Sequence, residues 1–166
     1  MNILDTILKI RSNPFIFFEL EIEFQKNEEI IRELLKSSGS FIKFLDPKIK
    51  EDINYAKIAA ASEGISVQYL DDKFRNNKEI MKLAVQNNGT ALMFASKTLQ
   101  DDKNIVELAV VNFGTAIRYA SEKFKDDLDI AKKAVINHPP AFNYISLRLK
   151  NDKEIIKIAI KEYSKN

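Results

Sequence analysis

Residues Gly89 to Ser96 read GTALMFAS, and residues Gly114 to Ser121 read GTAIRYAS, 25 residues further along the chain. The same step in both directions divides most of the chain into six blocks without insertion or deletion: 14–38, 39–63, 64–88, 89–113, 114–138 and 139–163. A fixed period of this length is typical of repeat proteins, in which each block is one structural unit. We number the positions within a block from 1 to 25, so that Gly89 holds position 1.

The second half of each block has the spacing of a buried helical stripe. In the fourth block, positions 17, 18, 21 and 22 are Ile105, Val106, Ala109 and Val110, which share one face of a helix. Asp or Asn at positions 13 and 14 predicts the N-cap, and the acid three residues later, as in the stretches 76–79 and 151–154, predicts reciprocal capping. Asn-x-Gly predicts the helix end, where glycine can take a positive φ.

The first half of each block predicts a shorter helix at about positions 2–8. An Asp or Ser at position 8 then predicts a brief extra turn before the second helix. Alanine at positions 3 and 21 allows neighbouring backbones to approach closely. An aromatic row at position 6 is predicted to fill the core between layers, although it could also form a base-stacking ladder: Phe44, Tyr69, Phe94, Tyr119 and Tyr144.

Helices this short need neighbours, because helix nucleation is costly and each apolar face must be covered. The sequence therefore predicts an all-α fold, an α-solenoid of six helical hairpins in one domain spanning 1–166, with 1–13 as an N-terminal capping helix. Residues Glu19 to Phe24 alternate with a period of two, as a strand would, but their register with the other blocks favours a helix. The polar end, 161–166, is expected to be a solvated terminal face.

Composition excludes several classes of protein. A hydrophobic fraction of 45% excludes intrinsic disorder, and a net charge of +2 gives no general attraction to nucleic acid or membrane. The chain has no cysteine, which excludes disulfide-linked partners and thiol catalysis and fits a reducing cytoplasm. No stretch resembles a signal peptide or reaches the roughly 20 apolar residues that span a bilayer. We therefore expect a soluble cytoplasmic protein.

The stretch from Leu99 to Ser121, LQDDKNIVELAVVNFGTAIRYAS, resembles the tandem repeats of the domain-of-unknown-function family numbered 4116. The blocks that begin at Gly64 and Pro139 match more loosely, and the two blocks before Gly64 match weakly. The resemblance implies a helical repeat module with no established activity, catalytic residues or cofactor. The chain departs from the pattern at Pro139, where proline replaces glycine, so the junction there is expected to bend differently.

Catalytic and metal-binding motifs are missing, which predicts a protein that is not an enzyme and has no cofactor. The only histidine, His138, has no motif around it and is interpreted as a residue at a helix end. The acidic pairs 71–72, 101–102 and 126–127 recur at the capping positions, and capping accounts for them better than catalysis or metal binding.

Two features predict a surface that binds a protein or a peptide. Apolar residues break the pattern at variable, mostly polar positions in the fourth and fifth blocks, and exposed apolar clusters mark partner surfaces: Met93, Val111, Phe113 and Ile136. Additional core packing or a crystal or oligomer contact would also account for these four residues. Position 24 carries Asn87, Asn112 and Asn137, whose amides could grip the backbone of a bound peptide. Helix C-terminal capping explains the same asparagines.

A basic ridge at positions 10 and 12 supports an alternative, which is binding of nucleic acid or another polyanion. Stacked blocks would align these side chains along one edge: Lys48, Lys50, Lys73, Arg75, Lys123, Lys125, Arg148 and Lys150. Thr98 and Gln100 interrupt the ridge, and the capping aspartates lie beside it, so a solvated, self-neutralised turn also explains it. Protein or peptide binding is the leading hypothesis.

Overall fold

The computed structural model describes residues 2–165, and these form helices without a β-strand. Met1 and Asn166, the outermost residues of the predicted capping helix and polar end, lie outside the described residues. The N-terminal helix is α1 (Ile3–Ser12). Every later block then repeats a 3₁₀ helix, a single α-helical turn and a longer α-helix. The all-α repeat fold predicted from the 25-residue period is confirmed.

The three kinds of helix recur at the same positions. The 3₁₀ helices are η1 (Pro14–Glu19), η2 (Gly39–Phe44), η3 (Gly64–Tyr69), η4 (Gly89–Phe94), η5 (Gly114–Tyr119) and η6 (Pro139–Tyr144). The single turns are α2 (Ile22–Gln25), α4 (Pro47–Lys50), α6 (Asp72–Arg75), α8 (Lys97–Gln100), α10 (Glu122–Lys125) and α12 (Leu147–Lys150). The long helices are α3 (Glu28–Ser37), α5 (Ile53–Ser62), α7 (Lys78–Asn87), α9 (Lys103–Asn112), α11 (Leu128–Asn137) and α13 (Lys153–Tyr163).

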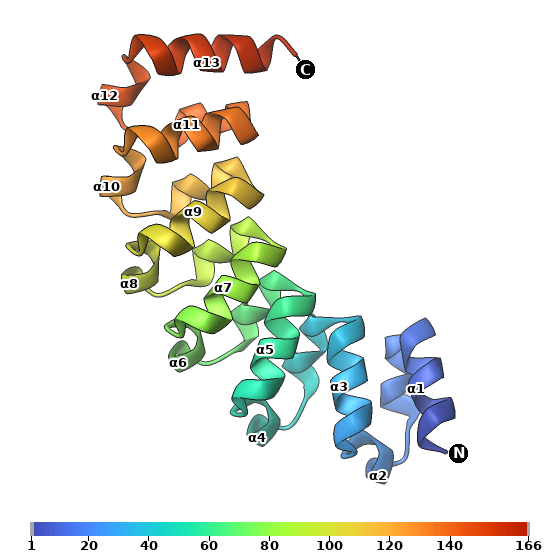
Figure 1. Cartoon of the computed structure of the whole chain (residues 1–166). Coiled ribbons are helices and arrows are strands. Elements are labelled where there is room, and N and C mark those ends of the chain that lie inside the picture. Colours follow the sequence, from blue (N-terminus) through green and yellow to red (C-terminus); the bar gives the residue numbers. More distant parts are fainter. Residues whose placement is uncertain (1, 166) are drawn as a thin grey trace.

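The long helices stack side by side in chain order, from α1 to α13, and turn progressively along the stack (Figure 1). The 3₁₀ helices form a second layer against them, in which η2 to η6 pack on one another in sequence. Helix η1 contacts η2 through the rings of Phe15 and Phe18 against Phe41. The single turns line one edge of the stack (Figure 1). At that edge the position 8 amide donates to the position 12 carbonyl of the preceding block in three junctions, with N···O distances of 2.9 to 3.0 Å. The result is one continuous core.

The first helix of each block is a 3₁₀ helix at positions 1–6, where the sequence predicted a short helix at about positions 2–8 without specifying its type. A 3₁₀ helix has three residues per turn, so positions 1, 4 and 7 share the inward face. In the fourth block these are Gly89, Leu92 and Ala95, and all three are buried.

This period turns the aromatic row at position 6 partly outward, so the prediction that it fills the core is wrong for its two ends. Phe44 is 52% exposed and Tyr144 is 39% exposed. Tyr69, Phe94 and Tyr119 are half-buried against the core.

Glycine at position 1 serves a different purpose from the one predicted. No described residue has a positive φ, so the glycines do not act as left-handed helix ends. A Cβ atom built on Gly89 would instead lie 2.3 Å from the carbonyl oxygen of Ala109, and the same contact recurs at Gly39, Gly64 and Gly114. Only a residue without a side chain allows the 3₁₀ helix to approach the end of the long helix so closely.

The predicted helix starts are confirmed, but reciprocal capping is not. The carboxylate of Asp102 accepts from the amides of Asn104 and Ile105, and Asn77 caps α7 in the same way. Glu79, predicted to reach back to the cap, forms an ion pair with Lys57 of the preceding block at 2.9 Å. Packing against the preceding long helix offers the glutamate a cation, which is a stronger partner than an amide.

The two ends of the stack differ. Helix α1 covers α3 with Thr6, Ile7 and Ile10, as a cap should. At the C-terminal end, the predicted solvated face is confirmed over 161–165, where Tyr163 is 49% exposed. Ile160, just before it, is also 66% exposed, because α13 has no further helix against its outer face among the described residues.

Two local expectations were also tested. The alternating segment 19–24 contains the end of η1 and most of α2, so the helical interpretation is confirmed. The junction before Pro139 was expected to bend differently, and this was wrong. His138 has φ −148° and ψ 101°, close to −148° and 106° at Phe113 in the preceding junction. Proline suits the first residue of a helix, because its fixed φ is already helical.

Candidate functional site

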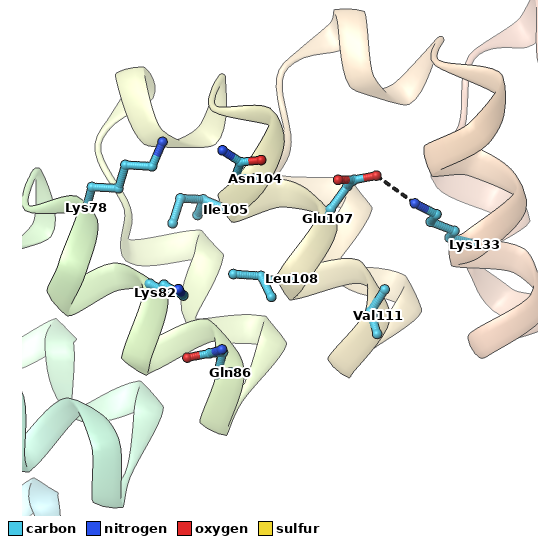
Figure 2. A pocket seen from close by; sticks show the side chains of 9 residues that line it. All are labelled: Lys78, Lys82, Gln86, Asn104, Ile105, Glu107, Leu108, Val111 and Lys133. Atoms are coloured by element: carbon cyan, nitrogen blue, oxygen red, sulfur yellow. Dashed lines mark hydrogen bonds and ion pairs between the residues drawn. The ribbon is translucent and has the colours of Figure 1, made fainter.

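A groove of about 510 Å³ runs between α7 and α9 on the outer surface of the long-helix layer. Figure 2 shows Lys78, Lys82 and Gln86 along α7 on one side and Ile105, Leu108 and Val111 along α9 on the other. Asn104, Glu107 and Lys133 complete the lining, the last of these from α11. The groove therefore combines an apolar side with a polar, mostly basic side.

The apolar side follows from the spacing of α9. Ile105, Leu108 and Val111 lie three residues apart, so their side chains form one stripe along the helix. Ile105 is buried, Leu108 is half-buried, and Val111 at the far end is 58% exposed. The stripe therefore begins in the core at Ile105 and ends on the solvent-exposed surface at Val111.

Two ion pairs involve charged residues that line the groove, one between α7 and α9 and one between α9 and α11. Lys78 Nζ lies 2.6 Å from an oxygen of Asp102, and Lys133 Nζ lies 2.6 Å from Glu107 (Figure 2 draws the second pair). The hydrogen bond from Lys78 keeps the pKa of Asp102 below its ordinary value, and the hydrogen bond to Glu107 raises the pKa of Lys133. Lys82, one turn along α7 from Lys78, is exposed and makes no ion pair or hydrogen bond within residues 2–165.

The four predicted apolar anchors are all exposed, but they do not form one surface. Val111 lines the groove, whereas Met93 belongs to η4 in the other layer. Phe113 packs on the ring of His138 with centroids 4.9 Å apart, and Ile136 occupies the same position on α11 as Val111 does on α9. Their exposed fractions are 45% for Met93, 58% for Val111, 38% for Phe113 and 54% for Ile136.

The asparagine row does hold backbone groups, but they belong to this chain. The Asn112 amide oxygen accepts from the amide of Gly89 at 2.6 Å, and its nitrogen donates to the carbonyl of Gln86 at 2.9 Å. Asn87 and Asn137 repeat this arrangement at the neighbouring junctions. Each asparagine therefore caps the end of the preceding long helix and ties two blocks together. Sequence alone could not choose between this and a peptide clamp, because the partner backbone lies about 25 residues away.

The basic ridge is largely neutralised. Ion pairs hold Arg75 to Asp72, Lys123 to Asp101, Lys125 to Glu122 and Arg148 to Asp126. Lys50 and Lys150 donate to carbonyl oxygens of their own blocks, and the Lys73 ammonium lies over the ring of Phe74. The ammonium of Lys48 has no partner among the described residues. The basic ridge is therefore present, but most of its charged side chains already bind carboxylates or carbonyl oxygens of this chain.

The structure also shows the surroundings of the histidine and of the acidic pairs that were considered as catalytic or metal-binding residues. The ring of His138 stands against Phe113 with its Nδ1 atom buried. Asp101 and Asp126 each bind a serine and a cation of the next block, which keeps the pKa of both carboxyls below the ordinary value. Within residues 2–165, no group of three or more acidic or histidine side chains is placed to hold a metal ion.

Position 19 lysines were missed in the sequence analysis. Whether such a lysine forms an ion pair depends on the residue that faces it from the next block. The sequence contains one signal of this, because position 16 is glutamate in some blocks and asparagine in others. Asn104 is such an asparagine in the block after Lys82, and both residues line the groove.

No helix within the described part of the chain is long and apolar enough to cross a membrane. The model of a family described as Domain of unknown function matches three times in tandem, at residues 52–100, 102–147 and 129–166. Neither the curated proteins nor the solved structures contain a match to this sequence. Since the three family matches together cover well over half of the sequence, the chain belongs to the family Domain of unknown function (DUF4116).

Proposed function

We propose that this protein is a non-enzymatic binding module, and that it binds a protein or peptide segment in the groove between α7 and α9. The observation that carries the proposal is the stripe from Ile105 to Val111, which continues from the core into an open groove bordered by lysines. Exposed apolar surface within a polar border is typical of protein interaction sites.

The shape of the groove favours a polypeptide partner. It is open along α7 and α9, and its apolar contact is a line of side chains and not a closed pocket. A peptide can lay alternate or helically spaced side chains along such a line, whereas a small metabolite needs a pocket that encloses it.

The basic ridge provides less support for polyanion binding. Six of its eight side chains donate to carboxylates or carbonyls of this chain: Lys50, Arg75, Lys123, Lys125, Arg148 and Lys150. A phosphate backbone would have to displace these partners before it released counterions. We therefore keep the groove as the proposed site.

The absence of cysteine supports a cytoplasmic location, also as a proposal.

The test is selection of binders from a displayed library of random 12-residue peptides, followed by affinity measurements on Val111→Asp and Ile136→Asp. Both residues are exposed at the same position of neighbouring long helices, but only Val111 lines the groove. We expect Val111→Asp to weaken the selected peptides at least about tenfold, which corresponds to about 1.4 kcal/mol. Ile136→Asp should leave their affinity nearly unchanged.

Two results would contradict the proposal. One is a library from which the wild-type protein selects no peptide. The other is a set of selected peptides that bind Val111→Asp as tightly as the wild type.

A further inference from the structure

Lysine at position 19 of a long helix pairs with the next block where that block offers a glutamate at position 16. Lys57 on α5 lies 2.9 Å from Glu79 on α7, and Lys132 on α11 lies 2.7 Å from Glu154 on α13. This pair bridges neighbouring long helices on the outer surface of their layer. It is part of how adjacent blocks are joined.

The pair is missing at the groove. Position 19 of α7 is Lys82, but position 16 of α9 is Asn104, which has no charge to offer. The nearby carboxylates are already engaged, because Asp102 binds Lys78 and Glu107 binds Lys133, each at 2.6 Å. Lys82 therefore lacks the carboxylate partner that Lys57 and Lys132 have.

The net charge of the groove depends on which of its lysines have a carboxylate partner. Its lining contains three lysines and one glutamate, so it is basic, and the positive charge that is not balanced within residues 2–165 is centred on Lys82. A partner lying on Leu108 and Val111 would cover Lys82 as well, since all three line the same groove. Covering a charged group costs free energy unless the partner supplies an opposite charge. Complementary charge of this kind sets specificity more than total affinity.

We infer that the groove selects an acidic peptide segment, in which apolar side chains lie on Leu108 and Val111 while a Glu or Asp carboxylate binds the Lys82 ammonium. The inference rests on the proposed function and adds the chemistry of the partner. The carboxylate of the partner takes the place that Glu79 and Glu154 occupy beside Lys57 and Lys132.

The first measurement compares matched peptides. Each peptide selected by the wild-type protein is synthesised as it stands and with every Glu and Asp changed to Gln and Asn. We expect the acidic form to bind at least about fivefold more tightly at low salt, and the difference to shrink as salt rises. In Lys82→Gln the two forms should bind alike. The control is Lys132→Gln, which removes a position 19 lysine outside the groove and should retain the preference.

A second variant, Asn104→Glu, retains Lys82 but gives its ammonium a carboxylate partner within the protein. Asn104→Glu restores at the groove the pair that Lys57 forms with Glu79, so it suits the fold. We expect Lys82 to bind the new carboxylate and the preference for acidic peptides to fall to about that of Lys82→Gln. Helix content and thermal midpoint should be retained or slightly raised, which separates this result from unfolding.

The outcomes distinguish the inference from the proposed function. Equal affinity of wild-type protein for acidic and neutral forms, with binding still lost in Val111→Asp, overturns the acidic partner and leaves the groove in place. A preference that survives in both Lys82→Gln and Asn104→Glu also overturns it. If single-stranded RNA binds the wild type and loses affinity in Lys82→Gln while no peptide is selected, both proposals fail and the partner is a polyanion.

Discussion

Crowding, not backbone conformation, selects glycine at position 1. The carbonyl oxygen of Ala109 lies where a Cβ of Gly89 would stand, and three more blocks repeat the contact. The Gly89 amide also binds Asn112 on the neighbouring long helix. Asparagine accompanies glycine in the three central blocks, and the two proline blocks have Ser37 and Glu162 at position 24 instead. Proline has no amide hydrogen for an asparagine to accept.

Gly89→Ala is therefore expected to destabilise the protein. The added methyl group meets backbone, which cannot rotate away, and overpacking of this kind costs about 1–3 kcal/mol. Equilibrium unfolding in urea measures the change, with Lys103→Ala at an exposed helical position as the control. A free energy of unfolding for Gly89→Ala equal to that of the control would show that the contact with Ala109 is not restrictive.

At the scale of the element, capping and pairing between blocks use the same residue. One oxygen of Asp102 caps α9 through the amides of Asn104 and Ile105, and the other binds Lys78 of α7. Helix start and helix packing are thus coupled through one carboxylate. The long helices begin at the predicted places because their caps are local in sequence. Their ion pairs could not be predicted, because these connect residues about 22 to 26 positions apart.

This coupling predicts how stability depends on pH. The hydrogen bond from Lys78 lowers the pKa of Asp102 in the folded state, so the ionised carboxylate stabilises the fold at neutral pH. That contribution is lost as pH falls through the lowered pKa. Asp102→Asn keeps the capping oxygen and removes the charge. We expect it to be less stable than the wild type at about pH 7, by less than about 1 kcal/mol.

Unfolding in urea at pH values from about 7 to about 3 measures the difference between the two proteins. The difference should shrink towards the acidic end of this range. A difference that stays constant with pH would mean that the charge of Asp102 contributes nothing to stability.

At the scale of the whole molecule, stability comes from neighbours in the stack. Each block contacts the blocks beside it through its helical layers, and three junctions are also joined at the edge of single turns. In such an array stability is the sum of block and interface contributions, so the number of blocks can change while the architecture is retained.

Deletion of residues 89–113 tests this property. It removes one whole period and joins Asn88 to Gly114, a junction equivalent to the native Asn88–Gly89. We expect a helical, cooperatively unfolding protein with a lower midpoint and a smaller m-value, since less surface is buried. Deletion of 89–101, about half a period, breaks the register and should abolish cooperative unfolding. If both deletions unfold the protein equally, the blocks are not interchangeable units.

The sequence by itself determined the period, the helical class, the starts of the long helices and the family, because these depend on spacings within one block. It also identified exposed apolar residues, of which Val111 lines the groove. Only the tertiary structure decided that the first helix is 3₁₀, that glycine is selected by crowding, and that Asn112 holds the backbone of its own chain. It alone showed that Lys82 lacks a partner. These features depend on which atoms of one block face the next, and that is fixed by packing and not by spacing along the chain.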